Sequence, residues 1–365
     1  MCMKTVLIGV GQAGGKLTRE LVAYDDRMGF GAVRGAVGVN TAAVDLRDLP
    51  FETVLVGQSR VSGQGVGGDN ELGAEVMEAE TREVLAALEG RLTAETESIV
   101  TIAGLGGGTG SGGAPVLARE LARVYDVPVY GLGILPGRNE GKLYQVNAGR
   151  SLKTFAREAD GLLLADNDAF RSAGESITEG FDAINGEIAK RIGLLLAAGE
   201  VVDGVGESVV DSSEIINTLR DGGIAALGYA AAEAGADAEA NINVVTSITR
   251  RAVLTGSSLP DATDADSALL VVAGDPDAIP RKGVERARRW VEEETGSLQV
   301  RGGDFPLSSD RLAALVLLGG LERSDRVQSF MQRASQARDA DRTSTEESSG
   351  DSGATWASDD LDDLV

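Results

Sequence analysis

A chain of 365 residues, 42% of them hydrophobic, is long enough to bury a sizeable core and to form two domains. Asp and Glu number 57 against 34 Lys and Arg, so the formal net charge is −23, and this balance excludes the basic face that nucleic-acid binding needs. Histidine is absent and Cys2 is the single cysteine, which excludes imidazole catalysis, a disulfide framework and a cysteine-ligated metal site.

The composition also indicates the surroundings of the protein. Only six of the 34 cationic residues are Lys, and this acidic, Lys-poor composition suits a halophilic protein, because concentrated salt screens the repulsion between acids. No apolar run approaches the roughly 20 residues of a membrane helix, and the opening MCMKTVLIGVGQ lacks the cleavage pattern of a signal peptide. We therefore expect a cytoplasmic protein without direct membrane insertion.

Strand-like and helical patterns alternate along the first half of the chain. Strands are predicted, in chain order, over residues 4–10, 31–39, 53–56, 98–103, 127–135 and 161–165. Helical patterns separate most of them, over residues 16–24, 74–88, 114–125 and the segment between the last two strands. This alternation predicts a Rossmann-like, doubly wound parallel sheet in a nucleotide-binding domain over residues 1–175.

The second half has a different pattern. A long central helix is predicted over residues 176–198, and a smaller α+β domain over residues 199–334. Within that domain we expect helices at 238–254 and 281–294 and strands at 268–273, 297–300 and 311–318. Residues 335–365 are polar and acidic and cannot bury a core, so a disordered acidic tail is predicted there.

The most unusual segment is GLGGGTGSGG, residues 104–113, which lies between a predicted strand and a predicted helix. Backbone N–H groups of such a loop can turn inward to form an anion nest, with the helix dipole behind it. Thr109 and Ser111 add hydroxyl donors. The loop lacks the Lys of a Walker A motif, so it predicts phosphate binding of another kind.

Two more glycine loops follow strands in the same domain. GVGQAGG, residues 9–15, contains a GxGxxG pattern that alone would suit a dinucleotide, and GVGGDNELG occupies residues 65–73. However, Asn40 stands at the end of the second strand, where NAD-binding folds place an acid. Three loops at one sheet edge suit a nucleoside triphosphate better, which leaves an NAD-dependent Rossmann oxidoreductase as a disfavoured alternative.

The heptapeptide GGGTGSG, residues 106–112, resembles the signature of the tubulin/FtsZ superfamily. GQAGG in the first loop and SVVDSSEIINTL, residues 208–219, resemble the archaeal CetZ group of that superfamily. The resemblance implies a GTPase that uses GTP or GDP and Mg²⁺ and polymerises head to tail with itself into protofilaments. It also implies that Mg²⁺ is coordinated mainly by the phosphates and not by protein side chains.

The same resemblance carries a set of residues over to the nucleotide. The phosphates would lie against Gly11, Gln12, Ala13, Gly14, Gly15, Asn40, Gly68, Asp69, Asn70, Gly107, Gly108, Thr109, Gly110 and Ser111. Glu140 in LPGRNEGK would bind the ribose, and Asn167, Phe181 and Asn185 the base. Phe181 and Asn185 are four residues apart on one helix face, although a core Phe beside a partly buried Asn is an alternative. Lys16 could reach phosphate or face solvent.

Catalysis is assigned by the resemblance to Asp211 and Glu214, which would act on the nucleotide of a neighbouring subunit. The spacing Asp-Ser-Ser-Glu is also that of a capping box at a helix start, and both roles can hold at once. Two details depart from FtsZ: Val209 replaces the usual Asn, and Glu214 resembles the α-tubulin version.

The biological role is predicted only from the resemblance. We expect a cytoskeletal protein that controls cell shape. An FtsZ-type cell-division ring protein is the alternative, but its tail would carry a short hydrophobic and basic peptide, whereas this chain ends in DDLDDLV. The acidic tail leaves open a tail-binding protein as a partner.

Overall fold

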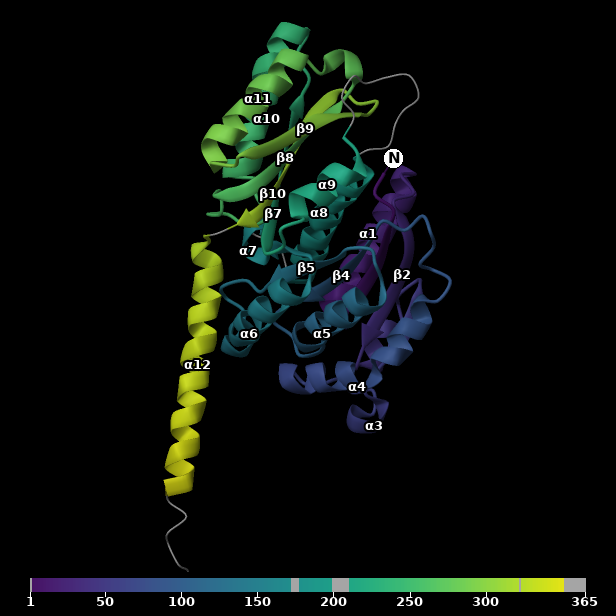
Figure 1. Cartoon of the computed structure of the whole chain (residues 1–365), viewed down its shortest axis with the longest axis vertical. Helices are drawn as coiled ribbons and strands as arrows, with labels where there is room; N and C mark the ends of the chain where they lie inside the picture. Colours follow the sequence, from purple (N-terminus) through teal and green to yellow (C-terminus); the bar gives the residue numbers. More distant parts are fainter. Residues whose placement is uncertain (1, 172–176, 199–209, 322, 351–365) are drawn as a thin grey trace, which may run out of the picture.

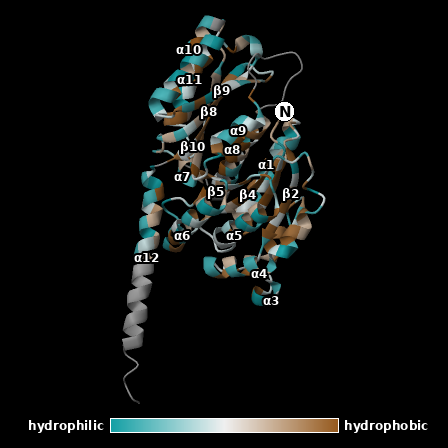
Figure 2. Ribbon diagram, viewed as in Figure 1, coloured by the Kyte–Doolittle hydropathy of each residue, from teal (hydrophilic) through white to brown (hydrophobic). Residues whose placement is uncertain are grey.

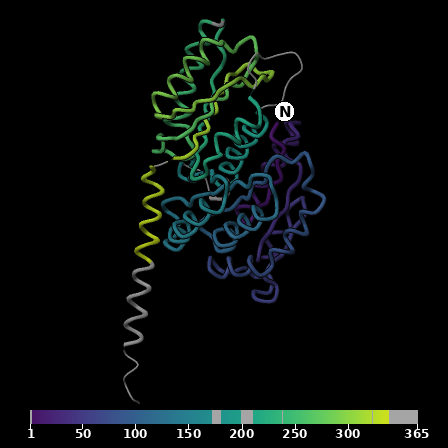
Figure 3. Tube along the Cα trace, viewed as in Figure 1, coloured from purple at the N-terminus to yellow at the C-terminus, as the bar shows by residue number. Residues whose placement is uncertain are grey.

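A ten-stranded sheet runs through the protein in the order β3-β2-β1-β4-β5-β6-β7-β10-β8-β9 (Figure 1). The structure is a computed structural model that describes residues 2–171, 177–198, 210–321 and 323–350. The predicted boundary at residues 175–176 and the residues just before Val210 lie outside this described part. Figure 3, coloured along the chain, shows the first 170 residues at one end of the molecule and residues 224–321 at the other, while the last helix runs back beside the first half.

The first six strands are parallel and confirm the predicted Rossmann-like sheet, since their order is the 3-2-1-4-5-6 of that fold. They are β1 Thr5–Val10, β2 Val33–Asn40, β3 Glu52–Leu55, β4 Ser98–Gly104, β5 Val129–Leu135 and β6 Gly161–Asp166. The helices between and after them are α1 Gly11–Met28, α2 Ala43–Leu46, α3 Gln58–Val61, α4 Asn70–Leu88, α5 Thr109–Val124, α6 Lys142–Glu158 and α7 Asn167–Phe170.

The central helix α8, Ile177–Ala197, runs back toward the start of the sheet. The Met3 amide, just before β1, donates a 2.8 Å hydrogen bond to the Leu196 carbonyl, so the end of α8 lies at the amino edge of the parallel strands. The rest of the chain forms α9 Ser212–Leu219, β7 Ile224–Glu233, α10 Ala238–Leu254, β8 Ala265–Gly274, η1 Pro276–Ala278, α11 Arg281–Thr295, β9 Gln299–Pro306, β10 Arg311–Leu321 and α12 Asp325–Gly350.

Strand β7 is absent from the sequence prediction, and it joins the two halves into one sheet. It pairs in parallel with β6 over two register pairs, Leu162 with Ile224 and Leu163 with Ala225, and antiparallel with β10 over eight. Its sequence IAALGYAAAE is rich in small residues, which lack the β-branched signature of a strand. Small residues are needed here because α10 packs closely on this strand, where a side chain at Gly228 would overlap the Ala252 carbonyl.

The last helix extends further than expected. A disordered tail is predicted from residue 335, and in the structure α12 continues through that position to Gly350; the predicted domain boundary at 335 stays a prediction (Figure 1). The reason is cooperative helix growth: the first turns of α12 dock on α6, and adding residues to a formed helix costs far less than starting one. Residues 351–365, with the acidic end of the predicted tail, lie outside the described part.

Hydrophobic cores cover both faces of the sheet, because its strands are covered by helices on each side (Figure 2). Successive side chains of β1 point into the two cores in turn. Val6 and Ile8 face the core shared with α4, α5 and α6, and Leu7 faces the core shared with α1 and α8. Among the described residues, no helix is long and apolar enough to cross a membrane.

The net charge of −23 predicts that the fold depends on salt. In molar KCl the screening length falls to about 3 Å, and in dilute buffer it rises to about 30 Å, so that surface acids repel one another across the molecule. Circular dichroism over a KCl series should show helical signal lost at low salt, with light scattering as the control for aggregation. An unchanged spectrum in dilute buffer would contradict this expectation.

Candidate nucleotide-binding site

The glycine loops meet at the carboxyl edge of the parallel strands. The chain leaves β1 toward β2 and β4 toward β5, in opposite directions along the sheet, so the loops after β1 and β4 lie side by side at the point where the strand order reverses. A cavity of about 710 Å³ opens there. Most predicted nucleotide residues line it: Gly11, Gln12, Ala13, Asn40, Gly68, Gly107, Gly108, Thr109, Gly110, Glu140, Asn167, Phe181 and Asn185.

The three loops can touch one another because the glycines at their contacts have no side chains. Gly11 has a φ of +74°, and a Cβ there would lie 3.0 Å from the Gly110 amide nitrogen, so the first and third glycine loops meet backbone to backbone. The middle loop closes over them, because a Cβ on Gly73 would lie 2.5 Å from the Gly108 carbonyl oxygen. The glycines at these positions therefore form one continuous backbone surface around the cavity.

Asn40 is held in place by its own turn. Its Oδ1 accepts hydrogen bonds from the amides of Thr41 and Ala42, at 2.8 and 3.2 Å, and its Nδ2 donates to Asp45. Asp45 also accepts a 3.0 Å bond from the Gln12 Nε2, which orients the first loop. An acid at position 40 would lose the Nδ2 donor and repel Asp45, so the amide suits this position.

Ribose and base residues lie at the other end of the cavity. The Glu140 Oε1 accepts hydrogen bonds from the Gly137 amide at 2.7 Å and from the Asn167 Nδ2 at 3.2 Å, which ties two loops together. Phe181, with 36% of its surface exposed, and Asn185 face the cavity from the same side of α8. A ring and an amide in this arrangement can stack on a base and bond its edge.

Five predicted phosphate residues do not line the cavity. Gly14 faces β4, where a side chain would overlap the Ile102 carbonyl, and Gly15 packs on Leu49. The Asp69 carboxylate caps α4 by accepting from the Leu72 amide at 3.0 Å. Asn70 and Ser111 are buried between the glycine loop and the helices behind it. These five support the loops from behind, and their predicted contact with phosphate stays a prediction.

Other residues line the cavity without having been predicted. Lys16, left open by the sequence, does so, as do Asp45, Tyr144 and Asp182. Tyr144 is 46% exposed beside Gly106, and its aromatic ring in the first turn of α6 is the signal that could have identified it. Arg326, on α12, is a further residue that no pattern in the sequence singles out; its guanidinium contacts Asp166 and Asp168, on either side of Asn167.

The two predicted catalytic acids lie far from this cavity. Asp211 is the N-cap of α9, as the Asp-Ser-Ser-Glu spacing predicts, but its carboxylate accepts from the Ser213 amide at 2.5 Å, one residue before the amide that a capping box uses. The Ser212 hydroxyl donates a 2.6 Å bond to Glu97, which directly precedes β4. The start of α9 is therefore fixed at the amino edge of the strands, whereas the cavity lies at their carboxyl edge.

The acids differ in their electrostatic surroundings. Hydrogen bonds from Ser213 lower the pKa of the Asp211 carboxyl, so this group stays ionised. Partial burial raises the pKa of Glu214, against a hydrogen bond from the Asp211 amide that lowers it. A carboxylate with a raised pKa is a stronger base than an exposed one, which suits Glu214 to accepting a proton from water.

Comparison with known proteins shows the family. Residues 4–174 match the model of the tubulin/FtsZ family GTPase domain, and residues 174–336 match the C-terminal domain of tubulin-like CetZ. The chain is 72% identical to the tubulin-like protein CetZ2 of Haloferax volcanii over 363 residues, covering 100% of both chains.

Solved structures agree with this. One of CetZ2 from Haloferax volcanii, a GTPγS-bound protofilament, matches with a TM-score of 0.90 and covers 93% of this chain and 100% of that one. One of CetZ1 from the same organism, a GDP-bound monomer, is 48% identical, has a TM-score of 0.85 and covers 92% and 100% of the two chains. The chain therefore belongs to the CetZ group of the tubulin/FtsZ family, and its first half is that family's GTPase domain.

Proposed function

We propose that this protein binds GTP in the 710 Å³ cavity, assembles head to tail into cytoplasmic protofilaments and hydrolyses GTP where two subunits meet. One observation carries the proposal: the cavity lies at the carboxyl edge of the sheet, and Asp211 and Glu214 lie at the amino edge. A subunit cannot bring these two edges together within itself. Stacking one subunit on the next places the acids of one over the cavity of the other.

The cavity fits a triphosphate. A Cβ added at Gly107 would meet no atom within 4 Å, so a phosphate has space to lie against the loop. The backbone N–H groups of the loop supply the hydrogen-bond donors. Mg²⁺, when bound with the nucleotide, neutralises charge on its phosphates. The residues of this chain hold the nucleotide, exclude bulk water at the contact and, through Glu214, accept the proton of the attacking water.

Guanine specificity and the role in the cell are parts of the same proposal. Asn167 and Asn185 offer donors and acceptors to a base edge, and a site built on hydrogen bonds rejects a base that leaves them unpaired. Control of cell shape, with cell division as the alternative, is the part of the proposal that rests only on the resemblance to the CetZ group. A protein that binds the acidic tail stays a prediction from the sequence.

Sedimentation tests the proposal directly. Pure protein in molar KCl with Mg²⁺ should pellet with GTP and remain in solution with GDP, because the γ-phosphate lies at the subunit contact. ATP at the same concentration is the control for the base: calorimetric titration should give an affinity for GTP at least about a hundredfold above that for ATP. Equal affinities, or pelleting that does not depend on nucleotide, would refute the proposal.

A further inference from the structure

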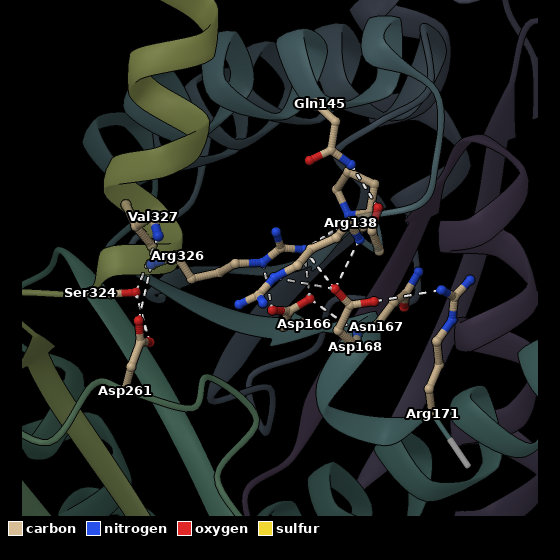
Figure 4. Close-up of polar contacts among 12 residues, drawn as sticks. Arg138, Gln145, Asp166, Asn167, Asp168, Arg171, Asp261, Ser324, Arg326 and Val327 are labelled. Atoms are coloured by element: carbon tan, nitrogen blue, oxygen red, sulfur yellow. Dashed lines mark hydrogen bonds and ion pairs between the residues drawn. The ribbon is translucent and has the colours of Figure 1, made fainter. Parts of the chain in front are cut away.

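Arg326 is a buried charge at the start of α12, and it is paired with an acid from the distant strand β6 (Figure 4). Its side chain is 3% exposed and that of Asp166 is 4% exposed. The Arg326 Nε lies 2.7 Å from one Asp166 carboxylate oxygen, and the Nη2 lies 3.1 Å from the other. This bidentate ion pair fixes the orientation of both side chains more strongly than a single hydrogen bond would.

The same guanidinium reaches a second loop. Its Nη2 donates to the Pro136 carbonyl at 2.8 Å, and it lies 3.4 Å from the Asp168 carboxylate (Figure 4). Pro136 follows β5 and begins the predicted ribose loop, whereas Asp166 ends β6 and begins the predicted base loop. Arg326 therefore ties together the ends of two neighbouring strands, and both of these ends border the nucleotide cavity.

These contacts hold the side chains that face the nucleoside. Asp166 accepts from the Asp168 amide at 3.1 Å and so caps α7, whose first residue is Asn167. Asn167 in turn bonds Glu140 in the ribose loop. The base residue and the ribose residue thus share one rigid frame, with Arg326 beneath it.

Arg326 itself is anchored through α12. Its backbone amide donates to Asp261 at 3.0 Å, and its guanidinium lies over the Phe330 ring at 4.5 Å. Two turns after Arg326, Arg333 donates to Gln145 on α6, which donates to the Gly137 carbonyl in the ribose loop. The docked helix therefore touches the nucleoside end of the cavity at two places.

We propose that Arg326 is a positioning residue for the nucleoside half of the nucleotide: it aligns Asn167 and Glu140 and couples the docking of α12 to guanine binding. This inference rests on the proposed function, since it assigns a role within that binding site. The polyphosphate lies against the glycine loops, which Arg326 does not touch. Its removal should therefore weaken recognition of base and ribose and spare recognition of phosphate.

The test uses Arg326→Lys in the full-length protein. Lysine keeps the buried charge beside Asp166, but its single ammonium cannot bond both carboxylate oxygens and the Pro136 carbonyl together. Affinities for GTP, GDP and ATP would be measured by calorimetry, and that for inorganic triphosphate by competition. We expect GTP and GDP to bind about tenfold more weakly, the preference for GTP over ATP to fall, and triphosphate binding to stay within about twofold.

A second variant and a control keep the result interpretable. The double substitution of Arg326→Met and Asp166→Asn removes both buried charges together, so that neither is left unpaired, and should lose the same selectivity. Arg281→Lys makes the same substitution at an exposed arginine that pairs with Glu285 on α11, outside this frame and outside α12, and should leave all four affinities unchanged.

The outcomes separate the two proposals. Wild-type protein that fails to bind GTP would overturn the proposed function, and this inference with it. Wild-type binding with unaltered selectivity in the Lys and double variants would overturn only the role of Arg326. Equal weakening of GTP and triphosphate would also overturn it, since that result means a general structural role.

Discussion

Replacing Glu214 with Ala is expected to slow phosphate release by about a hundredfold while leaving GTP binding and assembly in place. The carboxylate is held at the first turn of α9, and its raised pKa makes it the better base of the two acids. Because α9 starts at the sheet edge opposite the cavity, removal of the Glu214 carboxylate cannot disturb the nucleotide that its own subunit binds. Slower hydrolysis should prolong the life of the filaments, which light scattering would follow after a limited addition of GTP.

Mixing two inactive variants tests the geometry. Glu214→Ala subunits keep an intact cavity, and Thr109→Ala subunits, which lose a hydroxyl beside Thr41, keep intact acids. A mixed contact pairs the two intact halves, so the mixture should release phosphate faster than either variant alone. Glu239→Ala, in the first turn of α10, is the matched control for loss of an acid at a helix start and should match wild type. Full specific activity in dilute, monomeric wild-type protein would refute catalysis across subunits.

The second large effect concerns two glycines of the same loop. A Cβ at Gly112 would overlap the Asn70 carbonyl oxygen of α4 and lie 2.7 Å from the Ala74 amide nitrogen. Neither backbone group can move without separating α4 from α5. We expect Gly112→Ala to lower the free energy of unfolding by about 3 kcal/mol and the Tm by about 4 °C, although Ala is normally the better helix former.

Gly107→Ala is the matched comparison. A Cβ there meets nothing within 4 Å and points into the open cavity, so the folded chain gains no clash. We expect an unchanged Tm in thermal unfolding followed by circular dichroism, together with weaker GTP binding because the methyl group takes space beside the phosphates. If Gly112→Ala melted like wild type, the close contact between α4 and α5 would not constrain the fold as described.

Local patterns account for what the sequence predicted well. Strand, glycine loop and helix follow each other within a few residues, so the cradle around Thr109 and the cap at Asp211 could be recognised from neighbours in the chain. Which atoms of a loop face the cavity is a different matter. Gly14 and Asp69 lie in the predicted loops, yet one packs on β4 and the other caps α4, and no local signal separates these uses.

Long-range contacts account for what was missed. Arg326 and Asp166 are 160 residues apart, and an Arg next to Asp325 at the start of a helix looks like a solvated residue until the fold pairs it. Strand β7 was missed because its residues are small. The close approach of α10 requires small residues there, and such residues have a low strand propensity. Such features are decided by tertiary packing, which overrides propensity.

The narrow pairing between β6 and β7 makes this line a mechanical seam. Two register pairs join the strands, and Ser258 fills the gap beyond them, donating to the Leu164 carbonyl and accepting from the Leu227 amide. Rotation of one half of the molecule against the other about this seam breaks few backbone bonds, whereas bending anywhere between β7 and β10 breaks many. We therefore expect a filament of such subunits to be softest within each subunit at this line, so that strain at one subunit contact would pass to the next as a twist about it.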